Sequence, residues 1–349
     1  MSQNNADSMI HQIRTIDAHT AGEPLRLVVD GLPTPEGATM LAKRAWAAKH
    51  LDHLRRAIML EPRGHADMYG ALLTEPVTPG AHAGVLFMHN EGWSTMCGHG
   101  VIAVTTMAVE RGLMWDAGAA REGGAIELVL DVPAGPVRAV ARSSTVDGRT
   151  RVDQVSFRNV PSFVLAAGVP VHAGGRTVPV DVAFGGAFYA IVDAEAAGLS
   201  IDIAKLPELK RTGMAIAREV ERVMKVVHPD EPGLTGVYGT IFTAPAQTAG
   251  AHLRNVTVFA DAEVDRSPCG SGTAAVMAVL DEMGVLGAGD GTFVHESLIG
   301  TCFTGHVAAR TRVADFPAIV PEIAGSAWIT GEHTFFVDAD DPLRAGFRI

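Results

Sequence analysis

Two short segments of this chain share one pattern, and that pattern limits the possible folds more than any other feature of the sequence. The first is Met96-Cys-Gly-His-Gly100 and the second is Asp265-Arg-Ser-Pro-Cys-Gly-Ser-Gly-Thr273. Each contains Cys-Gly-x-Gly, continues into an apolar run and reaches a glycine 15 residues after its cysteine, at Gly112 and at Gly284. Because the two cysteines are 172 residues apart, the repeat predicts two similar halves that face each other across one site.

Each repeated unit has the features of a buried helix that begins at its cysteine. Apolar and small residues recur at helical spacing in both runs, as shown by Ala103, Val104, Met107 and Ala108 and by Ala274, Ala275, Ala278 and Val279. The closing glycines lie where a helix C-cap is expected. Free N–H groups and the helix dipole at an N-terminus favour anions, so we expect them to lower the thiol pKa from about 8.5.

A thiol with a lowered pKa is a usable base at neutral pH. Two opposed helix N-termini would offer one thiolate from Cys97 or Cys269, one thiol from the other, and several N–H donors for a carboxylate. Such a set can remove a proton from the Cα atom of an amino acid and return a proton to the opposite face.

Composition narrows the class of protein. The 349 residues exceed the roughly 100–200 of one domain, so we expect two domains. The 47% apolar and 19% charged residues are typical of a globular protein, and the net charge of −11 argues against nucleic-acid binding. The sequence contains no hydrophobic signal core and no apolar run long enough to span a membrane. We therefore expect a cytoplasmic protein without nucleic-acid or membrane partners.

The chain contains three cysteines, two of them in the repeated units, which argues against a disulfide scaffold. Cys302 lies in a strand-like stretch and is expected to be a small core residue.

The order of segments predicts an α+β protein with two similar halves. The range 41–59 reads as one amphipathic helix with Lys43, Arg44, Lys49, Arg55 and Arg56 on its solvent side, and 208–227 reads as a second helix. Strand-like segments surround both cysteine units, and the Pro- and Gly-rich range 161–176 separates the halves. We predict an N-terminal half of residues 10–170 plus 338–349 and a C-terminal half of residues 171–337.

The motifs Met96-Cys-Gly-His99, Asp265-Arg-Ser-Pro-Cys-Gly-Ser-Gly272 and His19-Thr-Ala-Gly-Glu-Pro24 resemble those of the proline racemase family. The resemblance covers nearly the whole chain and implies two halves of the diaminopimelate-epimerase type, each a sheet wrapped around a central helix. It implies that the motif cysteines are the acid–base pair and that no metal or organic cofactor is needed. It further implies that Asp265 holds the ring nitrogen of the substrate and that the substrate carboxylate is held by the backbone around Gly98, His99, Gly270 and Ser271.

Within the family, several stretches are similar to the trans-3-hydroxy-L-proline dehydratases, among them Glu61-Pro-Arg-Gly-His-Ala-Asp-Met-Tyr-Gly70 and Asp341-Pro-Leu-Arg-Ala-Gly-Phe347. That branch usually has Thr where this chain has Cys269, whereas racemases and epimerases have Cys. The resemblance therefore implies dehydration of trans-3-hydroxy-L-proline to Δ1-pyrroline-2-carboxylate combined with epimerisation at C2. The alternative is a 4-hydroxyproline 2-epimerase or proline racemase without dehydratase activity.

Substrate geometry explains how one cysteine could suffice for dehydration. In trans-3-hydroxy-L-proline the hydroxyl lies opposite the carboxylate, and therefore on the same face as the Cα hydrogen. One base on that face can remove the proton and then protonate the departing hydroxyl, a role that the family resemblance gives to Cys97. A thiol at Cys269 on the opposite face would allow inversion.

Other interpretations remain open at this point. His99 is either a proton carrier or a ring packed beside the site, and Asp265 is either a substrate ligand or a helix N-terminal acid. A thiol-based redox or metal-binding protein could use Cys97, His99 and Cys269, although no adjacent second pair completes a metal site. As a partner we expect a small-molecule substrate. The sequence leaves open whether the protein is a monomer or a homodimer. Five loop residues either line the site or serve turn structure, namely His19, Glu23, Glu61, Arg63 and His65.

Overall fold

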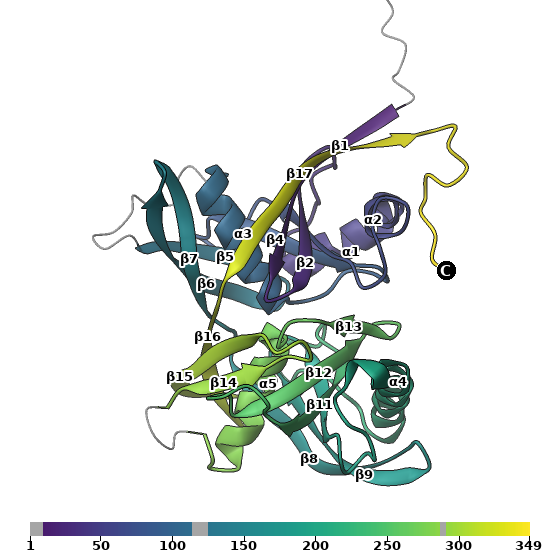
Figure 1. The fold of residues 1–349 in the computed structure, drawn as a ribbon, viewed down its shortest axis with the longest axis vertical. Helices are drawn as coiled ribbons and strands as arrows, with labels where there is room; N and C mark the ends of the chain where they lie inside the picture. The colour runs from purple at the N-terminus through teal and green to yellow at the C-terminus, as the bar shows by residue number, and fades with distance from the viewer. Residues whose placement is uncertain (1–9, 114–124, 287–290) are drawn as a thin grey trace, which may run out of the picture.

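The structure is a computed structural model that describes residues 10–113, 125–286 and 291–349. Figure 1 shows two lobes, one above the other, with helix α3 in the upper lobe and helix α5 in the lower lobe. The strands of the first lobe pair in the order β17 (Ala327–Asp338), β1 (Ile10–Thr20), β2 (Glu23–Asp30), β3 (Tyr69–Thr74), β4 (Ala83–His89), β5 (Ala125–Val132), β6 (Gly135–Val146) and β7 (Arg149–Arg158).

The second lobe repeats this pairing scheme. Its strands pair in the order β8 (Ser162–Ala173), β9 (Arg176–Phe184), β10 (Phe188–Asp193), β11 (Val237–Pro245), β12 (Leu253–Phe259), β14 (Phe293–Glu296), β15 (Cys302–Val313) and β16 (Phe316–Gly325), and the short β13 (Glu263–Asp265) adds to β12. Parallel pairs occur at equivalent positions, since β2–β3 matches β10–β11 and β4–β5 matches β12–β14. Pairing of β16 with β7 joins the lobes.

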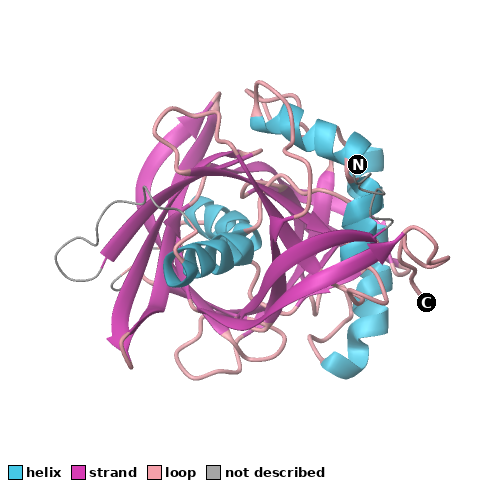
Figure 2. Ribbon diagram, turned by 90° about the horizontal axis from the view of Figure 1, so that it is seen from above, coloured by secondary structure: helices cyan, strands magenta, loops and turns pink. Residues whose placement is uncertain are grey.

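Each lobe wraps its strands around one central helix. Helices α3 (Gly98–Arg111) and α5 (Gly270–Glu282) lie inside the ring of strands when the molecule is seen from above (Figure 2). Both helices are apolar on nearly all sides, as expected of helices buried on every face. The prediction of an α+β fold with two pseudo-symmetric halves, each a sheet wrapped around a central helix, is confirmed.

The ends of both helices follow from local residues. Cys97 and Cys269 are the N-caps, and each sulfur accepts a hydrogen bond from the N–H three residues further on. Gly112 is the C-cap of α3 with φ 62°, and Gly284, just after α5, has φ 72°. Both glycines adopt the left-handed conformation that L side chains avoid.

The predicted helix over 41–59 is wrong in two respects. It is broken at Leu51 into α1 (Met40–His50) and α2 (Asp52–Met59). Lys43 and Arg55, predicted on the solvent side, are buried, because Lys43 donates to the carbonyl of Glu75 and Arg55 donates to the carbonyl of His89. Carbonyls at distant strand ends, together with Asp52 paired to Arg55, thus compensate the two buried cations.

The second predicted helix corresponds to α4 (Leu206–Val223), preceded by the 3₁₀ turn η1 (Ile203–Lys205). Cys302, expected in the core, is only partly buried at the start of β15. Among the described residues no helix is both long and apolar enough to cross a membrane.

The strand pairing bears on where the halves divide. β8 packs against α5, and β17 pairs with β1 and packs against α3. The chain therefore crosses between lobes in the short connections from β7 to β8 and from β16 to β17, rather than at residues 170 and 337. We propose these two connections as the domain limits.

Candidate active site

The two helix N-termini meet directly at the interface between the lobes. A Cβ atom added to Gly98 would lie 2.5 Å from the Cα of Gly270, and one added to Gly270 would lie 2.6 Å from the Cα of Gly98. Only glycine permits this approach, so the residues after Cys97 and Cys269 are fixed by contact between the two helix starts as well as by turn geometry.

One small cavity lies at this meeting point. All seven residues that the sequence predicts for the site line it, namely Cys97, Gly98, His99, Asp265, Cys269, Gly270 and Ser271. Its volume is about 10 Å³, which is the space of about one water molecule. The residues are therefore gathered around a small site, and a five-membered ring needs more space than this cavity offers.

The thiols in this small site do not have the lowered pKa that their helix positions predict. The sulfur of Cys97 accepts a hydrogen bond from Gly100 N at 3.2 Å, and that of Cys269 accepts one from Gly272 N at 3.3 Å. Burial nevertheless raises the pKa of Cys97 well above its ordinary value and raises the pKa of Cys269 to about 12. The prediction was wrong because loss of hydration, which sequence does not reveal, outweighs one N–H bond and the helix dipole.

His99 lies directly beside the first cysteine. Its Nδ1 atom is 3.3 Å from the sulfur of Cys97, and its backbone carbonyl accepts a hydrogen bond from Thr20. Burial lowers the pKa of His99 to about 3. The imidazole is therefore neutral at physiological pH, which favours a role in orienting the sulfur over a role as a store of protons.

Asp265 ends β13 and is held by the loop that leads into α5. Its Oδ1 accepts hydrogen bonds from the N–H and the hydroxyl of Ser267, and the Ser267 hydroxyl also accepts from Cys269 N. Burial raises the pKa of Asp265 to about 6, although the bonds from Ser267 oppose the rise. This carboxyl is thus a buried acceptor aimed at the same cavity as the sulfurs.

The sequence analysis missed the aromatic wall of the cavity. The hydroxyl of Tyr189 is 2.7 Å from the hydroxyl of Ser271 and 3.7 Å from the sulfur of Cys269. The hydroxyls of Tyr69 and Tyr238, one from each lobe, are 2.8 Å apart. The sequence does contain a signal for the Tyr69–Tyr238 pair. Tyr69-Gly70 and Tyr238-Gly239 are a further duplicated dipeptide at the start of equivalent strands.

A polar link joins the lobes on another side of the cysteine cavity. Arg266 of the second motif donates from its backbone and its side chain to Glu23, and its side chain also donates to the carbonyl of Asp67. Glu23 is fully buried, and burial together with the neighbouring Asp265 raises its pKa well above the ordinary value. Glu23 therefore belongs to the support of the site, although it does not line the cavity.

The other four loop residues that the sequence left open do not line the cysteine cavity. His19 accepts a hydrogen bond from Gly22 N, and Arg63 forms an ion pair with Asp341. The carbonyl of Glu61 accepts from Phe347 N, and the exposed His65 contacts the carbonyl of the next residue. These contacts serve turns and the attachment of the C-terminal segment. Within the described residues, no group of three or more His, Cys, Asp or Glu side chains could hold a metal ion.

Known proteins similar to this chain share both its sequence and its fold. It is 48% identical to a trans-3-hydroxy-L-proline dehydratase from Bacillus thuringiensis subsp. konkukian over 96% of this chain and 97% of the relative. It is 44% identical to a 3-hydroxyproline 2-epimerase from Burkholderia multivorans over 97% of this chain and 98% of the relative.

A crystal structure of a hydroxyproline epimerase from Agrobacterium vitis, with bound trans-4-hydroxy-L-proline, superposes with a TM-score of 0.87 at 32% identity, covering 97% of this chain and 95% of that chain. The sequence model of the family described as proline racemase matches residues 15–348. A match over nearly the whole length, together with the shared fold, confirms the resemblance seen in the motifs: the chain belongs to the proline racemase family.

Proposed function

We propose that this protein dehydrates trans-3-hydroxy-L-proline to Δ1-pyrroline-2-carboxylate and inverts C2 of hydroxyproline, with Cys97 and Cys269 as its acid–base pair and no cofactor. The observation that carries the proposal is that both cysteines, one from each lobe, line one cavity at facing helix N-termini. The names of relatives that are 44% and 48% identical over nearly the full length also support it.

Binding of the substrate carboxylate follows from the helix starts. The N–H groups of Gly100 and Gly272 are occupied by the cysteine sulfurs. The first two N–H groups of each helix have no partner within the helix, and they belong to Gly98, His99, Gly270 and Ser271. These groups would stabilise the carboxylate, and the negative charge that spreads into it when Cα loses its proton.

Dehydration would use one face of the ring. Asp265 would hold the ring nitrogen while the sulfur of Cys97 takes the proton from Cα. The electron pair of that C–H bond forms the C2–C3 double bond, the C3–O bond breaks, and the proton on Cys97 leaves with the hydroxyl as water. The remaining enamine then tautomerises to Δ1-pyrroline-2-carboxylate.

Inversion would share the first step and differ in the second. When the carbanion-like intermediate keeps its hydroxyl, a proton from Cys269 on the opposite face converts one C2 epimer into the other. Tyr189, whose hydroxyl lies 3.7 Å from the sulfur of Cys269, would orient that sulfur.

The proposal is tested with pure protein in heavy water. Trans-3-hydroxy-L-proline should give the pyrroline, and hydroxyproline that escapes dehydration should gain deuterium at C2. Cys269→Ser should reduce inversion by roughly 10²–10⁴-fold, the usual contribution of one acid–base group, and should change dehydration by less than about tenfold. Cys302→Ser, outside the cavity, is the matched control. Equal loss of both activities in Cys269→Ser would contradict the division of roles.

A second candidate is a 4-hydroxyproline 2-epimerase or proline racemase without elimination. The specific observation in its favour is the related solved structure that binds trans-4-hydroxy-L-proline. Rates measured on L-proline, trans-4-hydroxy-L-proline and trans-3-hydroxy-L-proline side by side separate the candidates, because only the first proposal predicts release of water.

A further inference from the structure

A second and much larger cavity lies between the lobes, next to the cysteine cavity. Its volume is about 400 Å³, within the range of small-molecule sites. One side comes from α1 and the segment after β4, and the other comes from the loop that leads into β11. Its lining includes the exposed residues Glu91 and Thr235, so this outer cavity opens to solvent.

Only a thin partition separates the two cavities. Tyr238 lines both of them, Tyr69 lines the cysteine cavity, and Ser94 lines the outer cavity. The Tyr69 hydroxyl bonds to Ser94 at 2.7 Å and lies 2.8 Å from the Tyr238 hydroxyl. The partition therefore consists of a chain of hydroxyl groups that crosses from one lobe to the other.

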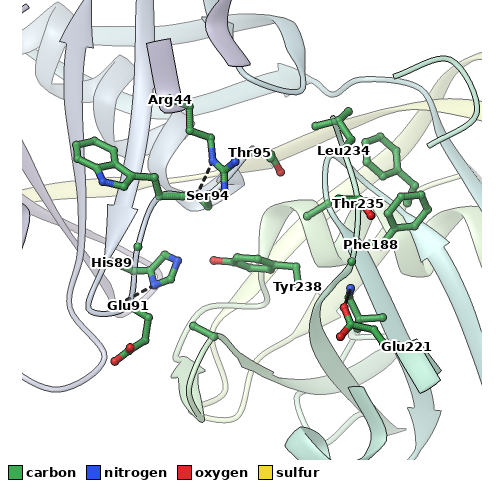
Figure 3. Close-up of a pocket in the computed structure, with 17 residues that line it drawn as sticks. Arg44, His89, Glu91, Ser94, Thr95, Phe188, Glu221, Leu234, Thr235 and Tyr238 are labelled. Atoms are coloured by element: carbon green, nitrogen blue, oxygen red, sulfur yellow. Dashed lines mark hydrogen bonds between the residues drawn. The ribbon is translucent and has the colours of Figure 1, made fainter. Parts of the chain in front are cut away.

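The outer cavity contains one arginine whose charge has no acidic partner. Arg44, on α1, donates from Nε to the carbonyl of Trp93, and no described carboxylate lies within ion-pair distance of it. Figure 3 shows its guanidinium on one side of the cavity and Tyr238 on the other. Partial burial lowers the pKa of Arg44, while the nearby hydroxyls of Tyr238 and Tyr69 act in the opposite direction. Its two terminal nitrogens remain available for a bidentate carboxylate.

The acidic residues of the outer cavity have other partners. Glu91 is paired with Arg348, and Glu221 accepts a hydrogen bond from Val237 N. Arg44 is thus the group that a small anion entering the cavity would meet, in a protein whose net charge of −11 otherwise disfavours anions.

We propose that the outer cavity is a second carboxylate-binding subsite, in which Arg44 holds the substrate by its carboxylate before the ring passes the Tyr69–Tyr238 partition to the cysteines. The identity of the ligand rests on the proposed function. The subsite itself is supported by the cavity, by its position next to the cysteine cavity and by the guanidinium of Arg44, which has no acidic partner among the described residues.

Kinetics on three variants test this subsite. Arg44→Gln should raise KM for trans-3-hydroxy-L-proline about tenfold with kcat within twofold, because the chemistry lies beyond the partition. Arg44→Lys keeps the positive charge but loses the two parallel N–H donors of the guanidinium. Its KM should therefore lie between those of the wild-type protein and Arg44→Gln. Arg56→Gln, an exposed cation on α2, is the matched control and should leave KM unchanged. An unchanged KM in Arg44→Gln, or a loss confined to kcat, would overturn the proposal.

A binding measurement separates this proposal from the proposed function, because it needs no turnover. Saturation-transfer NMR with acetate as the probe should show binding to the wild-type protein and to Arg56→Gln, weakened at least fivefold in Arg44→Gln. Acetate held by the helix N-termini would persist in both proteins, so an acetate titration that is identical in the wild-type protein and in Arg44→Gln would refute the subsite even if dehydration is observed. Arg44-dependent acetate binding in a protein that neither dehydrates nor deuterates hydroxyproline would refute the proposed function and leave the subsite standing.

Discussion

The ionisation of Asp265 should lower the free energy of unfolding as the pH rises from mild acid to neutral, while the lowered pKa values of the buried His99 and His295 act in the opposite direction. This carboxyl is 4% exposed, and burial raises its pKa from 3.8 to about 6. The rise corresponds to about 3 kcal/mol of stability. Because the folded pKa lies above the unfolded one, the native state is favoured while the group is protonated. That contribution is complete below about pH 4 and is lost as the pH rises through about 6.

Asp265→Asn isolates this effect. The amide keeps an oxygen that can accept both hydrogen bonds from Ser267, and it cannot ionise. We expect the variant to match the wild-type protein near pH 4 and to exceed its free energy of unfolding by up to about 3 kcal/mol at pH 7.5. For 349 residues unfolding as one unit, this is a rise in Tm of about 4 °C. Urea or thermal unfolding at several pH values measures the difference.

The matched control is Asp261→Asn, since the side chain of Asp261 is 68% exposed and its removal should give no comparable dependence on pH. A stability difference between Asp265→Asn and wild type that stays constant from pH 4 to pH 7.5 would refute the reasoning. The same variant should lose most hydroxyproline activity, because the ring nitrogen would lose its anionic partner. A gain in stability coupled to a loss of activity is the signature of a functional buried charge.

Three further outcomes follow from the packing and charges of the site. Gly98→Ala should abolish activity and destabilise the protein by about 2 kcal/mol or more, because its Cβ would lie 2.5 Å from Gly270; activity and Tm check this. Arg55→Gln should cost about 2–4 kcal/mol in urea unfolding, because the carbonyls of His89 and Asn90 would remain buried with fewer donors. Iodoacetamide should modify Cys97 and Cys269 far more slowly at pH 8 than free cysteine, because burial raises the pKa of both thiols; mass spectrometry measures the rates, and equal rates would contradict the burial of the thiols.

Helix starts and ends were the most predictable part of the fold. A thiol that caps a helix, glycines at the first turn and a left-handed glycine at the end are local features, so Cys97, Gly112 and Cys269 were assigned correctly from sequence alone. The duplication then predicted two halves, because two similar units each need a sheet to bury their helix. The seven predicted site residues line one cavity because the two similar halves bring their helix starts together.

The failures share a physical cause, which is burial by distant parts of the chain. Lys43 and Arg55 look like solvent-facing residues of one helix. Both are buried instead, and they donate hydrogen bonds to carbonyls at the ends of distant strands. The thiol pKa values moved upward because the opposite lobe removes water from Cys97 and Cys269. Tyr69 could have been found, since its dipeptide recurs at Tyr238, but the hydroxyl contact between them depends on how the lobes meet.

The raised thiol pKa values bear on how the proposed acid–base pair would become charged. Near Cys97 and Cys269, the buried groups Asp265 and Glu23 are acidic, and Arg266 is the cation that opposes them. A proline-type substrate brings a positively charged ring nitrogen into this acidic pocket, and an adjacent cation lowers a thiol pKa. Under the proposed function, one thiol would then lose its proton to solvent as the substrate enters and its pKa falls, whereas burial favours the neutral thiols in the free protein. If Cys97 and Cys269 act as proposed, burial that opposes ionisation in the free site would make formation of the base depend on binding of the substrate.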